Sequence, residues 1–319
     1  MAIKFGVFVP QGWRMDLLDF ADPVEKYEAM TRVGQEAERL GYDSIWVYDH
    51  FHTVPTPELE SVFECWTITA GLARDTKTIR LGQMVTCNGY RNPALLAKIA
   101  STVDVLSHGR LDFGIGAGWY EHEYRAYGYD YPDGPTRLKM LGDALQIIHA
   151  MWAAPYATVE GAYHRVRGAI NEPKGVQKPH PPIWVGGGGE KVTLKLVAKY
   201  ADACNVGGWD PDVYRHKFSV VREHCATVGR DYSAILKSSE VFLYLTDHPE
   251  RIDQEIAHLS PAVQEEIHSR FLVATPATAK SRLLALVDAG VEYFIVYLFN
   301  AARLEPVQQF AQEVRPAFR

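Results

Sequence analysis

Short apolar runs alternate with longer amphipathic stretches along almost the whole chain. Within the longer stretches, apolar residues recur with the helical period, for example over residues 23–40, 93–107 and 276–289. The short runs are apolar at most positions, which is typical of strands buried on both faces, as in a parallel sheet. The pattern predicts eight strands, at residues 3–10, 43–51, 79–88, 111–118, 181–187, 202–208, 235–245 and 293–299.

Eight strands, each followed by a helix, favour a (β/α)8 TIM barrel over two doubly wound halves. Two stretches interrupt the alternation. An aromatic, polar one at 154–180 predicts a small hairpin, and an acidic one around 248–269 predicts helix. We interpret both as insertions, after strands 4 and 7, because no linker rich in Pro, Gly or Ser separates two halves. We therefore expect residues 1–319 to form a single domain.

Composition narrows the class of protein. The chain has 319 residues with 33 Lys and Arg against 39 Asp and Glu, a formal net charge of −6. This mild acidity argues against a nucleic-acid or anionic membrane surface, which needs a basic stripe. We see no membrane-spanning run and no secretory signal in the first residues. The four cysteines, Cys65, Cys87, Cys204 and Cys225, show no CxxC spacing, so we expect free thiols and a cytoplasmic protein.

The predicted strand ends carry the candidate chemistry. In a TIM barrel, active sites lie at the C-terminal ends of the strands. Here those ends are rich in His, Trp, Tyr, Asn and Gly, whereas the strand starts are plainer. The asymmetry favours an enzyme or a ligand-binding protein. The ends read VPQGW, YDHFH, TCNGYRN, GAGWYEHE, GGGGEK, NVGGW and LFNAAR.

A run of four glycines follows the fifth predicted strand. A hinge between domains and a backbone cradle for an anion are the two interpretations. Glycine lets the backbone approach a ligand, and a helix start presents free N–H groups, so we favour the cradle. The following helix is predicted from about Glu190, and neither the GxGxxG nor the P-loop pattern is present. The run consists of Gly186, Gly187, Gly188 and Gly189.

Asp49 and His50 close the second strand. A His at this place can transfer protons near neutral pH, and Asp49 could orient it or hold a ligand. A His hydrogen-bonded in a polar loop is the alternative. His52 makes a metal pair conceivable, but no third ligand stands at a suitable spacing, so we expect no metal.

The loop after the fourth strand, GAGWYEHEY, combines aromatic and acidic residues. A planar ligand could stack on Trp119, and Glu121 or Glu123 could donate a proton. Alternatively, the aromatics pack on the barrel rim and the charges face solvent, which is favoured for either carboxylate alone. Asn88, Arg91 and Asn92, after the third strand, could bind ligand or cap the next helix. No GxSxG elbow suggests a covalent hydrolase.

Together these motifs resemble the bacterial luciferase-like flavin family over nearly the whole chain, and most closely its branch that uses the deazaflavin coenzyme F420. The resemblance rests on WVYDHF, on the segment from IRLGQMVTCNGYRNP to GAGWYEHEYRAYG, and on PPIWVGGGGEKVTLKLVAKYADACNVGG. It implies a (β/α)8 barrel with the cofactor in the barrel mouth, a small-molecule substrate and a homodimer.

The resemblance also implies roles for single residues. The four glycines would surround the cofactor phosphate, Asp49 would contact the cofactor, and His50 would lie by the reacting ring carbon. A non-proline cis peptide is implied at about Met84-Val85, behind the ring. Further cofactor contacts are implied at Cys87, Asn88, Ala117, Gly118 and His122.

One departure from the family's sugar-phosphate dehydrogenases concerns the substrate. Their acidic proton donor aligns with Trp119, and their basic residues for the sugar phosphate have no clear counterpart. We therefore predict hydride transfer between coenzyme F420 and an unidentified small organic substrate. His50 would give or take the proton, with Glu121 as a second candidate. The alternatives are an FMN-dependent monooxygenase that uses O₂ and a non-catalytic flavin-binding protein.

Overall fold

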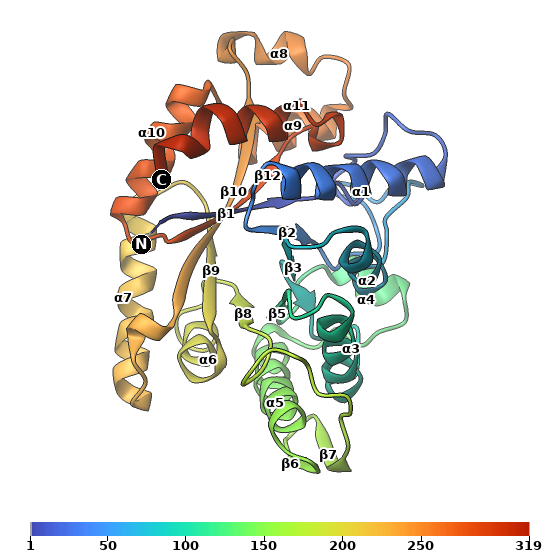
Figure 1. Cartoon of the computed structure of the whole chain (residues 1–319), viewed down its shortest axis with the longest axis vertical. Coiled ribbons are helices and arrows are strands. Elements are labelled where there is room, and N and C mark those ends of the chain that lie inside the picture. Colours follow the sequence, from blue (N-terminus) through green and yellow to red (C-terminus); the bar gives the residue numbers. More distant parts are fainter. Residues whose placement is uncertain (1, 319) are drawn as a thin grey trace.

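The computed structural model describes residues 2–318, in which eight parallel strands close into a barrel (Figure 1). The first strand pairs with both the second and the last, and the remaining neighbours pair in sequence order. The predicted (β/α)8 barrel is therefore confirmed. Its strands are β1 (Lys4–Phe8), β2 (Ser44–Val47), β3 (Arg80–Gln83), β5 (Leu111–Gly116), β8 (Ile183–Gly186), β9 (Ala203–Gly207), β10 (Leu236–Leu245) and β12 (Tyr293–Leu298).

Several of the helices begin at a polar capping residue followed directly by proline. Asn92 shows the pattern: its side-chain oxygen accepts from the backbone N–H of Ala94, and Pro93 fixes the first turn. These local signals explain why the sequence located the helices well. The helices around the barrel are α1 (Pro23–Arg39), α2 (Cys65–Asp75), α3 (Pro93–Leu106), α5 (Gly134–Ala153), α6 (Thr193–Tyr200), α7 (Pro211–Val228), α10 (Pro276–Asp288) and α11 (Glu305–Gln309).

Aromatic side chains fill the inside of the barrel beneath the strand ends. Trp46 of β2 and Trp184 of β8 meet edge to face, with ring centroids 4.8 Å apart, and both are buried. Glycine makes room for them: a Cβ at Gly82 would lie 2.2 Å from the Trp46 ring. This packed floor confines any ligand to the mouth of the barrel.

Two further segments extend from the barrel. The first contains an antiparallel hairpin of β6 (Ala157–Glu160) and β7 (Arg165–Ala169), at the bottom of Figure 1. The second, near the top, contains α8 (Ile252–Glu255) and α9 (Pro261–Arg270). A short strand that we did not predict, β11 (Leu272–Ala274), follows α9 and pairs with β10.

Other local differences bear on the site. The third predicted strand is split into β3 and β4 (Thr86–Cys87) by a cis peptide at Met84-Val85, as the resemblance implied. A short helix, α4 (Glu121–Ala126), occupies a segment predicted as loop. None of the helices in residues 2–318 has both the length and the apolarity needed to cross a membrane.

Candidate active site

A cavity of about 390 Å³ lies at the C-terminal ends of the strands, within the size range of small-molecule sites. Many of the residues predicted from the sequence line it: Asp49, His50, Met84, Val85, Cys87, Ala117, Gly118, Gly186 and Gly187. Others in the lining were not among the predicted contacts: Trp13, Arg14, Tyr48, Tyr90, Asn205, Glu240 and Arg270.

His50 is held on two sides at the wall of this cavity. Its Nδ1 lies 2.8 Å from Oε2 of Glu123, and its ring stacks on Trp13 with centroids 4.0 Å apart. The ring nitrogen Nε2 has no hydrogen-bond partner among the described residues. His50 is therefore oriented by the protein and keeps one nitrogen for a ligand.

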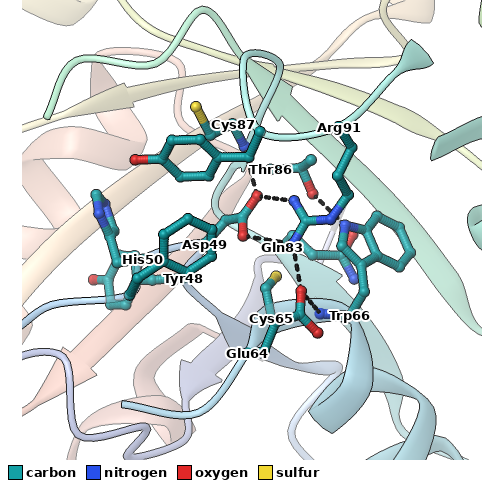
Figure 2. Close-up of polar contacts among 12 residues, drawn as sticks. Tyr48, Asp49, His50, Glu64, Cys65, Trp66, Gln83, Thr86, Cys87 and Arg91 are labelled. Carbon is teal, nitrogen blue, oxygen red and sulfur yellow. Dashed lines mark hydrogen bonds and ion pairs between the residues drawn. The ribbon is translucent and has the colours of Figure 1, made fainter. Parts of the chain in front are cut away.

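Asp49 is bound to the protein rather than directed freely into the cavity (Figure 2). Its carboxylate accepts from the backbone N–H of Cys87 at 2.8 Å and from both terminal nitrogens of Arg91 at 2.6 and 3.0 Å. The side chain of Asp49 is fully buried. Arg91 also pairs with Glu64, the N-cap of α2. The Asp49–Arg91 ion pair and the hydrogen bond from Cys87 therefore fix the ends of β2 and β4 relative to each other.

One wall of the cavity, the back wall, is formed by Val85 and the glycines around it. An added Cβ would lie 2.6 Å from Val85 at Gly116 and 2.8 Å from it at Gly186. At Gly118, a Cβ would lie 2.6 Å from Sγ of Cys87. Burial raises the pKa of that thiol to about 12, so Cys87 stays a neutral, apolar part of the wall. The wall is thus smooth and backbone-lined, which suits a flat ring.

The glycine run differs from the prediction in one respect. The helix after it begins at Thr193, not at about Glu190. Glu190 turns instead toward α7, where Lys217 Nζ donates to it at 2.6 Å and His216 Nε2 lies 3.0 Å away. The run is therefore followed by a turn before α6, and Thr193 reaches the cavity together with Gly187.

The structure does not bring every predicted residue to the cavity. Glu121 is exposed and pairs with Arg125, so Glu123 is the carboxylate of this loop that reaches the site. His122 is also exposed, with its ring 5.0 Å from that of His52. Asn88 lines a separate cavity, with its Oδ1 buried and unpartnered. Gly188 and Gly189 are also absent from the lining of the main cavity.

The side opposite the glycines is charged and aromatic. Arg14 pairs with Glu266 of α9 and lies over the rings of Trp13 and Phe242, at 4.3 and 4.6 Å. Glu240 accepts from the hydroxyl of Tyr48 at 2.8 Å, and burial raises the pKa of its carboxyl. A charged residue inside an apolar strand was the sequence signal for Glu240. Arg14 and Arg270 gave no comparable signal.

Comparison with known proteins places the whole barrel in one family. The family model for luciferase-like monooxygenases matches residues 3–297. The chain belongs to this luciferase-like family. It is 25% identical over 318 residues to the F420-dependent glucose-6-phosphate dehydrogenase of Amycolatopsis mediterranei, covering 89% of this chain and 92% of that protein.

Further similar proteins differ in what their names describe. A phthiodiolone/phenolphthiodiolone dimycocerosates ketoreductase of Mycobacterium sp. (strain JLS) is 30% identical over 252 residues, 72% of this chain and 64% of that protein. This chain thus spans less than two thirds of that relative. An F420-dependent secondary alcohol dehydrogenase, solved with an F420-acetone adduct, superposes with a TM-score of 0.81 at 20% identity over all of both chains. EDTA monooxygenase from Chelativorans sp. BNC1 superposes with a TM-score of 0.83 at 13% identity, covering 100% of this chain and 94% of that one.

The residues present fit a cofactor that has a flat ring and a phosphate, such as coenzyme F420. In the wall around Val85, Gly116 and Gly186 carry no side chain. At the other end, Gly187 has a φ of 117°, and a Cβ there would meet only Thr193 Cγ2, at 3.4 Å. The backbone there is open to a phosphate, and no side chain caps α6 in competition with it. Within residues 2–318, no group of three or more His, Cys, Asp or Glu is placed to hold a metal.

Replacing Gly186 by Ala tests this wall. The new Cβ would lie 2.8 and 3.2 Å from Val85, so the Val85 side chain, which lines the cavity, must shift. We expect cofactor affinity to fall about tenfold or more, which corresponds to about 1.4 kcal/mol. Gly142→Ala is the matched control. Gly142 lies in α5, and its Cβ would meet Leu196 of α6 at an ordinary distance of 3.6 Å. It should keep affinity unchanged and stabilise the helix by about 0.5–1 kcal/mol. Equal affinity in both variants, measured by titration, would argue against the proposed ring position.

Proposed function

We propose that this protein is an F420-dependent oxidoreductase that transfers a hydride between the deazaflavin and a small organic substrate. The observation that carries the proposal is His50, whose ring is fixed by Glu123 and Trp13 at the cavity that Val85 also lines, and whose Nε2 has no hydrogen-bond partner within residues 2–318. The named activity of the full-length dehydrogenase relative supports the choice of cofactor. A single domain over residues 1–319, a homodimer and a cytoplasmic location stay predictions.

The residues would divide the work as follows. Gly187 and Thr193 would hold the phosphate, and Val85, Gly116 and Gly186 would face the ring. When bound, the deazaflavin supplies or accepts the hydride. The protein contributes orientation, exclusion of water and a proton at Nε2 of His50.

The reacting group that we propose is a carbonyl and alcohol pair. The ketoreductase relative is named for this chemistry. In the reducing direction, the carbonyl carbon gains the hydride and its oxygen gains the proton from His50. The side of the cavity left for the substrate is lined by Trp13, Trp119 and Arg14, and an exposed Trp119 would pack against the substrate's apolar part.

Titration of the purified protein with each cofactor is the direct test. We expect coenzyme F420 to bind with a change in its absorbance and fluorescence, and FMN to bind at least about tenfold more weakly. Reduced F420 should then be oxidised in the presence of a panel of ketones, without consumption of O₂. Deazaflavins carry carbon in place of the reactive ring nitrogen and react poorly with oxygen.

Two outcomes would contradict the proposal. Tight FMN binding with O₂ uptake in the presence of reduced FMN would instead identify a monooxygenase. Binding of either cofactor without turnover of any ketone or alcohol in the panel would favour a non-catalytic flavin-binding protein. Gly186→Ala should weaken whichever cofactor binds, so it also reports whether binding is at the barrel mouth.

A further inference from the structure

Glu123 is a fully buried carboxylate whose two oxygens have different sets of partners. Its side chain has no exposed surface. Oε1 accepts from two backbone N–H groups, those of Phe51 at 2.6 Å and His52 at 2.8 Å. Oε2 lies 2.8 Å from Nδ1 of His50 and accepts from the hydroxyl of Tyr90 at 2.6 Å. These four polar contacts fix the position of the buried carboxylate, and packing alone does not require so many.

The charge state of Glu123 determines whether Nδ1 of His50 carries a hydrogen. Burial raises the pKa of the Glu123 carboxyl, but the hydrogen bonds and charge of His50, with the bonds from Tyr90 and the His52 N–H, outweigh it and leave the pKa below its ordinary value. An ionised carboxylate accepts hydrogen bonds and cannot donate one. Nδ1 of His50 must therefore carry the hydrogen between them.

We propose that Glu123 is a positioning residue that holds a hydrogen on Nδ1 of His50 and so assigns Nε2 as the nitrogen that exchanges a proton with the substrate. The effect of Glu123 on proton exchange with the substrate rests on the proposed function, whereas the tautomer of His50 does not. A neutral His has one hydrogen, so a hydrogen fixed on Nδ1 leaves Nε2 as an acceptor. Protonation of Nε2 then gives an imidazolium whose positive charge lies directly beside the Glu123 carboxylate.

The surroundings of His50 allow this assignment to persist. The ring lies parallel to Trp13, with 5° between the planes, and meets Trp119 and Tyr120 at centroid distances of 5.7 and 5.9 Å. Figure 2 shows the His50 ring pointing away from the Asp49–Arg91 ion pair. Among residues 2–318, Glu123 provides the acceptor within hydrogen-bonding distance of Nδ1, so Glu123 selects the tautomer.

Glu123→Gln is a sharp test because the backbone fixes how the new amide is oriented. The amide oxygen must take the Oε1 position, where Phe51 N–H and His52 N–H both donate. The NH₂ group then faces Nδ1 of His50, which has to become an acceptor. The hydrogen of neutral His50 should therefore move to Nε2. Nitrogen-15 NMR of the histidine-labelled protein without cofactor reads this change directly.

We expect the wild-type protein to show the Nδ1–H tautomer and Glu123→Gln the Nε2–H tautomer. In the oxidising direction, where Nε2 must accept the alcohol proton, turnover should fall about 100-fold or more with the cofactor dissociation constant within about twofold, since the acceptor nitrogen now faces away from the substrate. Tyr90→Phe is the control inside the network. It removes the other donor to Oε2 and should keep the wild-type tautomer, which a general loosening of the site would not do.

Glu160→Gln, on the exposed hairpin, controls for the loss of a glutamate charge and should match the wild type in every measurement. An unchanged Nδ1–H tautomer in Glu123→Gln would overturn the inference. So would a changed tautomer with full turnover in the oxidising direction. If the wild-type protein turns over no F420 at all, the proposed function fails while the tautomer result still decides what Glu123 does.

Discussion

Replacing His50 by Ala should leave coenzyme F420 bound and lower turnover by about 100- to 10,000-fold. General acid–base catalysis by a positioned side chain contributes a factor of this size. His50 is one residue of the cavity lining, whereas the cofactor would be held mainly by Val85 and the glycines. The cofactor dissociation constant and the single-turnover rate of hydride transfer, both measured on the same variant, separate binding from chemistry.

Chemical rescue makes the His50 prediction specific to proton transfer. The Ala variant leaves a space between Trp13 and Glu123, which free imidazole can occupy, so added imidazole should restore part of the turnover. The variant also leaves Oε2 of Glu123 with Tyr90 as its remaining donor, which costs about 1–3 kcal/mol of stability. Thermal unfolding must therefore confirm that the variant is folded at the assay temperature. Full turnover in the folded variant would exclude His50 as the proton-transferring group.

The barrel was predictable because its signals are local. Each strand is a short apolar run, and many helix starts carry a cap and a proline, so neither depends on distant residues. Strand β11 escaped prediction for a non-local reason. It pairs with Leu243 to Leu245, the end of β10, whereas β12 pairs with β10 only as far as Leu243. How far β10 projects beyond β12 is a property of the closed barrel, which the sequence of residues 272–274 does not contain.

The site was predictable at the strand ends and less so beyond them. Glu121 and Glu123 are two residues apart, and in a helix this separation turns side chains by about 200°. Because α4 has only six residues, its period could not be recognised, and the carboxylate that faces solvent could not be told from the one that faces His50. The pairing of Arg14 with Glu266 joins residues 252 positions apart and depends on where the inserted α9 docks.

Replacing Arg91 by Met should cost about 3–5 kcal/mol of the free energy of unfolding, the effect of leaving a buried charge without its partner. Asp49 has no exposed side-chain surface, and without Arg91 its carboxylate keeps one donor, the Cys87 N–H. Burial lowers the pKa of Arg91, yet the charge and hydrogen bonds of Asp49 raise it above its ordinary value overall, which reflects a strongly coupled pair. Denaturant unfolding with and without the substitution measures the loss.

A double-mutant cycle distinguishes this ion pair from simple packing by the Arg91 side chain. Asp49→Asn removes the charge that Arg91 neutralises, so Arg91→Met should cost about 1–3 kcal/mol less in the Asn background than in the wild type. Arg125→Met is the matched control: its partner Glu121 is exposed, and losing that pair should change stability by less than about 1 kcal/mol. Equal costs of Arg91→Met in both backgrounds would mean that the buried charge of Asp49 is not what Arg91 stabilises. The strand ends that carry Asp49, His50 and Cys87 would then owe their arrangement to the surrounding apolar packing.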